Sequence, residues 1–281
     1  MSATSIGDRA TTVPVTGGAR FAPRAAGFGA RVLGIAPEEA RTTPAAAIQC
    51  CRQERDLLRP DLTVVAADGT LLAEALGCSI ARTGQGGWRV GASADPEAAI
   101  DRAEDPDVLR TPAIGAALAA IEALAPEGEV ALLLRSPLCV ASVVLGRPLR
   151  LETGADDELI DACCLVATDL AKQALDRDAA VVLEEGAAPP PEALDLYAPL
   201  LKMLAHRGRP ASVLVHGSRA GAFADPPPGV GAVVTRAALS DWGQEWQPDP
   251  AQALFAPRIS PAASPERVQL LRAGLDREDG R

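Results

Sequence analysis

Several short apolar runs in this sequence are followed by side chains that can carry acid–base or ligand chemistry. Asp68 comes directly after "VVAA", and His216 comes directly after "SVLV", with Ser218 two residues further on. A carboxylate at the end of a buried run is costly unless it is paired, so we predict a functional role for Asp68. An imidazole can act as a general acid, as a metal ligand or as a structural side chain. The residues alone leave all three roles open for His216.

Two arginines offer a second kind of chemistry. Arg20 and Arg24 lie four residues apart in "ARFAPRAAG", after the first apolar run. Two guanidinium groups near one strand end can hold a carboxylate or a phosphate through paired hydrogen bonds. Solvated arginines on a loop are the alternative interpretation.

Further polar side chains follow the third and fourth apolar runs. Arg135, Ser136 and Cys139 lie in "RSPLCVASVVLG", while Glu184 and Glu185 lie near the end of "DAAVVLEEG". If these runs are neighbouring parallel strands, their carboxyl ends and these side chains meet at one edge of the sheet.

Complete motifs for metal, phosphate and nucleophile sites are absent from the sequence. It contains no GxSxG and no GxxxxGK[ST], and no cysteine follows Cys164, so the segment around His216 cannot supply a His/Cys/Cys zinc set. The six cysteines match neither a disulfide framework nor a CxxC zinc pattern. We expect them to be small buried side chains in a reducing compartment.

The elements that must position these residues follow from a series of short runs rich in Val and Leu. Such runs lie at 13–18, 61–68, 129–137, 178–186, 211–218, 229–235 and 251–257. They are typical of buried parallel strands. Amphipathic stretches between or after them predict helices at 43–58, 109–124, 156–175, 189–208 and 264–275. This alternation predicts an α/β protein with a TIM (β/α)8-type barrel, truncated before the eighth strand because no further apolar run follows.

Length and composition set outer limits on this prediction. We expect a single barrel domain over residues 1–281, with a flexible N-terminus of about ten residues and a charged tail at 276–281. No apolar run is long enough to span a bilayer and no signal-peptide stretch is present, so we expect a cytoplasmic protein without a membrane partner. The net charge of −10 argues against nucleic acid as a partner.

In combination, these segments resemble the uroporphyrinogen decarboxylase superfamily, which includes the methylcobalamin:thiol methyltransferases. Asp68 stands seven residues before the Ala of "ALG", as the essential Asp of the decarboxylases does, and Glu74 matches a Glu of the methyltransferases. "RSPLCVASVVLG" is similar to the family's "GPxTLAxxLxG" stretch. "LLKMLAHRGRPASVLVHGS" is similar to the segment ending in "HxCG". The resemblance covers residues 10 to 275 and implies the family's barrel fold.

The resemblance implies, first, a methyltransferase-like enzyme that moves a methyl group from a corrinoid to a thiol or a similar acceptor. His216 would then occupy a zinc-ligand position, but Ser218 stands where the methyltransferases have a zinc-binding Cys. The zinc site is therefore expected to be incomplete. Asp68 and His216 would be catalytic, and Arg20, Arg24, Glu74 and Ser218 would bind substrate. Zinc, or a corrinoid supplied by a partner, are the implied cofactors, and a corrinoid protein or a homodimer partner is the implied macromolecular partner.

Two alternatives stay open at this point. In a decarboxylase-like enzyme acting on a tetrapyrrole or another polycarboxylate, Asp68 would stabilise developing charge while Arg20 and Arg24 hold carboxylates. Val143 stands where the decarboxylases have a Tyr, and their late His belongs to the eighth strand. In a non-catalytic or partner-dependent subunit, another chain would cover the open edges of the incomplete barrel.

Overall fold

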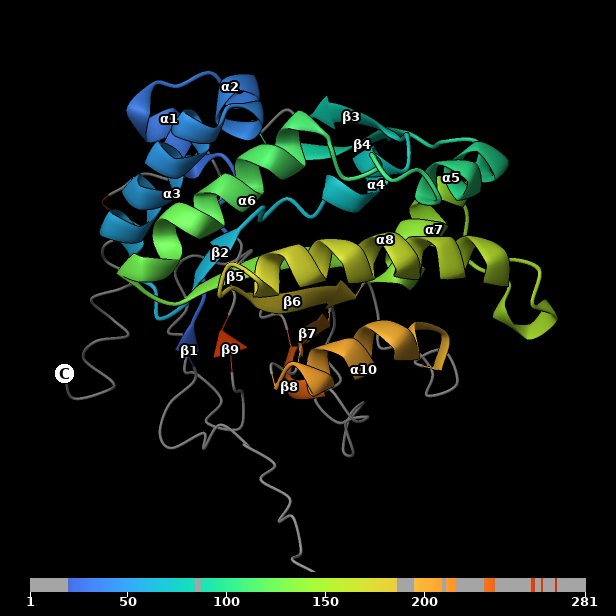
Figure 1. The fold of residues 1–281 in the computed structure, drawn as a ribbon. Helices are drawn as coiled ribbons and strands as arrows, with labels where there is room; N and C mark the ends of the chain where they lie inside the picture. Colours follow the sequence, from blue (N-terminus) through green and yellow to red (C-terminus); the bar gives the residue numbers. More distant parts are fainter. Residues whose placement is uncertain are drawn as a thin grey trace, which may run out of the picture.

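The computed structural model describes residues 20–83, 87–185, 195–208, 211–215, 230–235 and 254–255, together with Ile259 and Glu266. Over these residues the chain is a mixed α/β protein in which helices cover a parallel sheet (Figure 1). This confirms the α/β part of the predicted fold class.

A five-stranded parallel sheet forms the centre of the fold, with the strand order β2-β5-β6-β7-β8. Its strands are β2 (Thr63–Val65), β5 (Val130–Arg135), β6 (Ala180–Glu185), β7 (Ala211–Val215) and β8 (Val230–Thr235). Each strand lies inside one of the predicted apolar runs. The prediction succeeds here because a parallel sheet buried on both faces requires continuous apolar strands.

A second, two-stranded parallel sheet joins β1 (Arg20–Phe21) to β9 (Leu254–Phe255). Strand β9 confirms the seventh predicted run, whereas the first predicted run at 13–18 lies outside the described residues. Arg20 was predicted to follow a strand, and this was wrong: Arg20 is itself part of β1. The backbone carbonyl of Phe21 also accepts hydrogen bonds from the amides of Asp61 and Leu62, just before β2.

A closed barrel is not confirmed. In the described part of the chain, no strand ladder joins β8 to β9 or β1 to β2, so β2 and β8 are the edges of the five-stranded sheet. The described strands therefore have a parallel α/β architecture.

Helices precede or follow most strands, and proline starts many of them because its fixed φ suits the first helical turn. The helices are α1 (Phe28–Leu33), α2 (Pro37–Thr42), α3 (Pro44–Leu58), α4 (Leu71–Ala75), α5 (Pro96–Ala103), α6 (Pro112–Leu124), α7 (Pro137–Leu145), α8 (Asp157–Leu175) and α10 (Ala198–His206). Short 3-10 turns lie at Ala125–Glu127, Leu151–Thr153 and Asp195–Tyr197. Helices α3, α6 and α8 lie along β2, β5 and β6, and α10 lies beside β7 (Figure 1).

The helices predicted at 43–58, 109–124 and 156–175 are confirmed as α3, α6 and α8. The stretch 189–208 contains α10, and Gly208 beyond its end has the left-handed φ of +66° that favours glycine. The helix predicted at 264–275 lies outside the described residues except for Glu266, which is helical.

The sequence prediction missed an antiparallel pair, β3 (Ser79–Arg82) and β4 (Trp88–Ala92). Both strands are largely exposed, so they carry no continuous apolar run that would reveal them. The pair matters for the site because β4 places Trp88 beside residues of α2 and α3.

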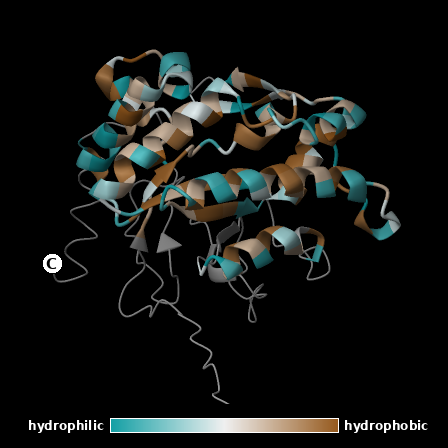
Figure 2. Cartoon of the chain, in the orientation of Figure 1, coloured by the Kyte–Doolittle hydropathy of each residue, from teal (hydrophilic) through white to brown (hydrophobic). Residues whose placement is uncertain are grey.

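Apolar side chains are buried on both faces of the central sheet. In Figure 2 the ribbons of β2 and β6 are mostly brown, the colour of apolar residues. In β5, Leu132 and Leu134 belong to the large cluster formed with the helices, whereas Ala131 and Leu133 belong to a smaller cluster on the other face. This alternation follows from the two-residue period of a strand. The charged residues of β5 and β6, which are Arg135, Glu184 and Glu185, lie at the carboxyl ends of these strands.

The six cysteines form no disulfide, and Cys50, Cys78, Cys163 and Cys164 are buried as predicted. Cys51 and Cys139 are only partly buried.

None of the helices in the described segments is both long and apolar enough to cross a membrane.

Gly29 allows α1 to pack closely against α3. A Cβ atom on Gly29 would lie 2.4 Å from the carbonyl oxygen of Cys50 and 2.9 Å from Cγ of Glu54. The backbone amide of Gly29 donates a hydrogen bond of 2.8 Å to Oε1 of Glu54, which fixes the two helices further. A larger residue at this position must push the helices apart.

We expect Gly29→Ala to destabilise the protein by about 1–3 kcal/mol, because the added methyl group overpacks the α1–α3 contact. Gly115→Ala is the matched control, since a Cβ on this helical glycine of α6 meets nothing within 4 Å. It should stabilise the protein by roughly 0.5–1 kcal/mol through helix propensity. Urea unfolding of both variants measures the difference, and equal effects would contradict the close packing at Gly29.

Candidate functional site

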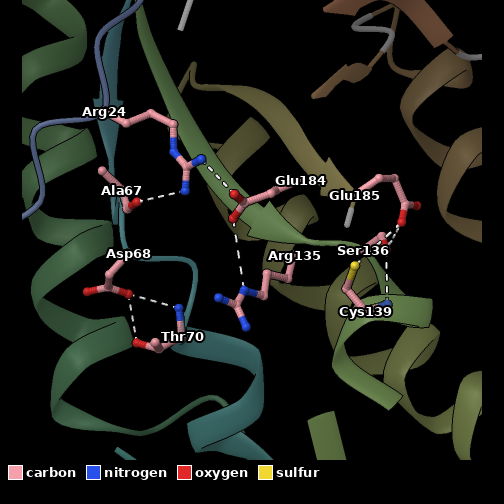
Figure 3. A network of polar contacts seen from close by, with 9 residues as sticks. All are labelled: Arg24, Ala67, Asp68, Thr70, Arg135, Ser136, Cys139, Glu184 and Glu185. Atoms are coloured by element: carbon pink, nitrogen blue, oxygen red, sulfur yellow. Dashed lines mark hydrogen bonds and ion pairs between the residues drawn. The ribbon is translucent and has the colours of Figure 1, made fainter. Parts of the chain in front are cut away.

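Charged and polar side chains gather where β2, β5 and β6 end, together with one arginine from the segment after β1 (Figure 3). The carboxyl ends of parallel strands meet at one edge of a sheet, which is where α/β proteins bind their ligands. The site described here consists of Arg24, Asp68, Arg135, Ser136, Cys139, Glu184 and Glu185.

A buried ion pair lies at the centre of this site. Nη1 of Arg24 donates to Oε1 of Glu184 at 2.6 Å, and Nη2 donates to the carbonyl oxygen of Ala67 at 3.2 Å. Arg24 is 3% exposed and Glu184 is 6% exposed. Such charges are stable out of water only when hydrogen bonds compensate them. The pair thus connects the segment after β1, the end of β2 and the end of β6.

Arg135 approaches the same carboxylate from the end of β5. Its Nε lies 3.9 Å from Oε2 of Glu184, and its side chain keeps 29% of its surface exposed. Arg24 and Arg135 reach Glu184 from different sides (Figure 3). Arg135 lies farther from Glu184 than Arg24 does, and its side chain is more exposed to solvent. An incoming anion can therefore reach Arg135.

The loop after β2 runs over this cluster in an unusual backbone conformation. Ala66 has a φ of +56°, which is uncommon for a residue with a side chain and tends to occur at functional sites. Gly69 has a φ of +67°, and a Cβ there would lie 3.1 Å from Oε2 of Glu184. Glycine therefore lets the loop pass close to the buried carboxylate.

Asp68 lies in this loop and is half-buried. Its Oδ1 accepts hydrogen bonds from the amide and the hydroxyl of Thr70, at 2.8 and 2.7 Å. The hydroxyl of Thr70 also accepts a hydrogen bond from Nη2 of Arg41 at 3.1 Å. Thr70 thus holds the carboxylate of Asp68 in one orientation at the strand end.

Glu74 joins the same network through Arg41. Nη1 of Arg41 donates to Oε1 of Glu74 at 3.1 Å, and Nη2 donates to Oε2. The guanidinium group also lies 5.4 Å from the ring centroid of Trp88, a cation–π contact. Sequence reasoning did not identify Arg41, because nothing in the pattern of α2 indicates that it reaches the end of β2.

Ser136, Cys139 and Glu185 form a second group beside the ion pair. Glu185 points away from Glu184, as adjacent strand residues do, and faces the start of α7 (Figure 3). The hydroxyl of Ser136 donates to Oε2 of Glu185 at 2.7 Å and accepts from the amide of Cys139 at 3.2 Å. The thiol of Cys139 lies 3.6 Å from the same oxygen of Glu185.

The structure brings together most of the predicted site residues that it describes. Arg24, Asp68 and the polar residues at the carboxyl ends of β5 and β6 share one edge of the sheet, and Glu74 is linked to Asp68 through Arg41 and Thr70. His216 and Ser218 lie outside the described residues. Among the described residues, no group of three His, Cys, Asp or Glu side chains is arranged to hold a metal ion.

Comparisons with known proteins give a structural match only. The chain matches no protein-family model, and a comparison with curated protein sequences finds no match. Among solved structures, a methyltransferase from Methanosarcina mazei superposes with a TM-score of 0.70 at 16% sequence identity. The match covers 94% of this chain and 95% of that chain. At this identity the likeness establishes a shared α/β fold.

Ser136→Ala tests the connection between α7 and Glu185. The variant loses the N-cap of α7 and leaves a buried carboxylate without one donor, so we expect a loss of about 2–4 kcal/mol in unfolding free energy. Thr111→Ala is the matched control, because Thr111 caps α6 by accepting from the amide of Ile114 at 3.2 Å. It should cost only about 1 kcal/mol. Equal losses in chemical denaturation would mean that the bond to Glu185 contributes nothing.

Proposed function

We propose that this protein is a methyltransferase-like enzyme that moves a methyl group from a corrinoid to a thiol or a similar acceptor. The observation that carries the proposal is the fold shared with a methyltransferase over nearly the full length of both chains. A second support is that the polar residues of this chain gather at the sheet edge where α/β proteins place their chemistry.

The residues at this edge are suited to preparing and holding an acceptor. Arg135 is a partly exposed cation, which can bind an anionic group on the acceptor. Asp68, oriented by Thr70, can take the proton of a thiol. The sulfur then bonds to the methyl carbon, and the electron pair of the methyl–cobalt bond of the donor stays with cobalt.

A zinc contribution from His216 belongs to this proposal on the sequence resemblance alone. His216 would supply one ligand, and Ser218 is a weak substitute for a thiolate. Further ligands would have to come from elsewhere, including a partner chain. The proposed methyl transfer does not depend on zinc.

We also propose that the strands close into a seven-stranded barrel around the site. The parallel β1–β9 pair supports this, as does the contact between β8 and β9. The hydrogen bonds from Asp61 and Leu62 to Phe21 bring β1 beside β2. Such closure would remove both open edges without an eighth strand.

The decarboxylase-like alternative is favoured by the position of Asp68 at the same sheet edge as Arg24 and Arg135, but one observation counts against it. That reaction needs arginines to hold substrate carboxylates, and Arg24 already donates to Glu184 and to Ala67. The methyltransferase-like function requires no such role for Arg24.

An assay with methylcobalamin and 3-mercaptopropionate, a thiol that carries a carboxylate, tests the proposal through the absorbance change that accompanies loss of the methyl group. We expect turnover by the wild-type protein and a decrease of at least tenfold in Asp68→Asn and in Arg135→Met, because one removes the proton acceptor and the other the anion-binding cation. Arg110→Met is the matched control, since the Arg110 side chain is 78% exposed and pairs only with its neighbour Asp107 among the described contacts.

The same preparation separates the alternatives. Carbon dioxide release from uroporphyrinogen without methyl transfer would support the decarboxylase-like function, and neither activity would support a partner-dependent subunit. Zinc that survives dialysis in the wild-type protein but not in His216→Ala would add His216 as a metal ligand.

A further inference from the structure

A pocket lies next to the site, between β2 and the helices α1, α2, α3 and α6. It encloses about 100 Å³ of free space. Alanine dominates its wall, including Ala40 of α2, Ala47 of α3 and Ala117 and Ala120 of α6. Methyl side chains are too short to fill the space between these helices. The pocket therefore follows from the alanine-rich sequence of the helices themselves.

Glu54, Arg41 and Asp68 supply the charged groups of this largely apolar wall. The carboxyl group of Glu54 accepts the amide hydrogen bond of Gly29 through Oε1, so it is held in place from behind. The surrounding protein atoms remove water from the carboxyl group of Glu54 and raise its pKa to about 8. Part of the residue still contacts solvent. A small molecule that enters the pocket can therefore reach a carboxyl group that is poorly hydrated.

The charges around the pocket favour an uncharged ligand. Arg41 already bonds to Glu74 and Thr70 and covers the ring of Trp88, so a cationic ligand would meet its guanidinium group. An anionic ligand would meet Asp68, which also lines the pocket. The volume suits a molecule about the size of benzene, which fills engineered cavities of similar scale.

We infer that this pocket binds a small uncharged organic molecule carrying one hydrogen-bonding group, with the carboxyl group of Glu54 as its polar partner. The methyl groups of the alanines contact its apolar part. The pocket shares Asp68 with the proposed methyl-transfer site, whereas Arg135 does not line it. Because Asp68 lies in both places, a bound molecule would contact the loop that carries the site.

Binding of phenol, measured by saturation-transfer NMR and titration calorimetry at pH 7, tests the inference. Phenol has the required size, no charge at this pH and one hydroxyl group. We expect phenol to bind the wild-type protein, and Ala117→Leu to weaken binding at least tenfold because the larger side chain fills the pocket. Ala119→Leu is the matched control on the same helix, since Ala119 does not line the pocket, and it should leave binding unchanged.

Two further variants keep the test decisive. Ala40→Leu fills the pocket from α2, a helix without fully buried residues, and should weaken binding even if Ala117→Leu does not fold. Glu54→Leu should abolish the preference for phenol over benzene. Absence of phenol binding to the wild-type protein, or equal binding by Ala40→Leu and Ala119→Leu, would overturn the inference. Equal phenol and benzene binding by the wild-type protein would overturn the role of Glu54.

Discussion

The buried ion pair between Arg24 and Glu184 is the interaction on which the end of the sheet depends. A guanidinium group that is 3% exposed cannot remain charged without strong compensation, and Glu184 supplies it. The second bond of Arg24, to the carbonyl of Ala67, requires that carbonyl to point toward the pair. The left-handed conformations of Ala66 and Gly69 flank this carbonyl. The shape of the loop that presents Asp68 is therefore coupled to the pair.

This coupling also decides which groups are available for chemistry. Arg24 and Glu184 largely neutralise each other, so they act as a structural frame. Arg135 and Asp68 lie at its margin, where they are partly exposed and already oriented by neighbours. A site with a fixed buried pair and partly exposed groups around it binds polar ligands without large rearrangement. This is consistent with acceptor binding in the proposed methyl transfer.

The sequence predicted the five strands of the central sheet well because each of them lies in a continuous apolar run, and it placed Asp68, Arg135 and Glu184 at strand ends for the same reason. The sequence could not predict that Arg24 pairs with Glu184, because the two residues are 160 positions apart and only the order of the strands in the sheet brings them together. The resemblance to carboxylate-binding arginines instead suggested that Arg24 faces a substrate. The contribution of Arg41 and the exposed β3–β4 pair were missed because neither produces an apolar pattern. The prediction for His216 stays a prediction, because that residue lies outside the described part of the chain.

A double-mutant cycle on the buried pair tests this central interaction most directly. Unfolding free energies would be measured for Arg24→Met, Glu184→Leu and the double variant. We expect each single variant to lose about 3–5 kcal/mol, because each leaves one buried charge without its partner. The double variant should lose less than the sum, with a coupling of about 2–3 kcal/mol. Losses that add to within roughly 0.5 kcal/mol would contradict the central role of the pair.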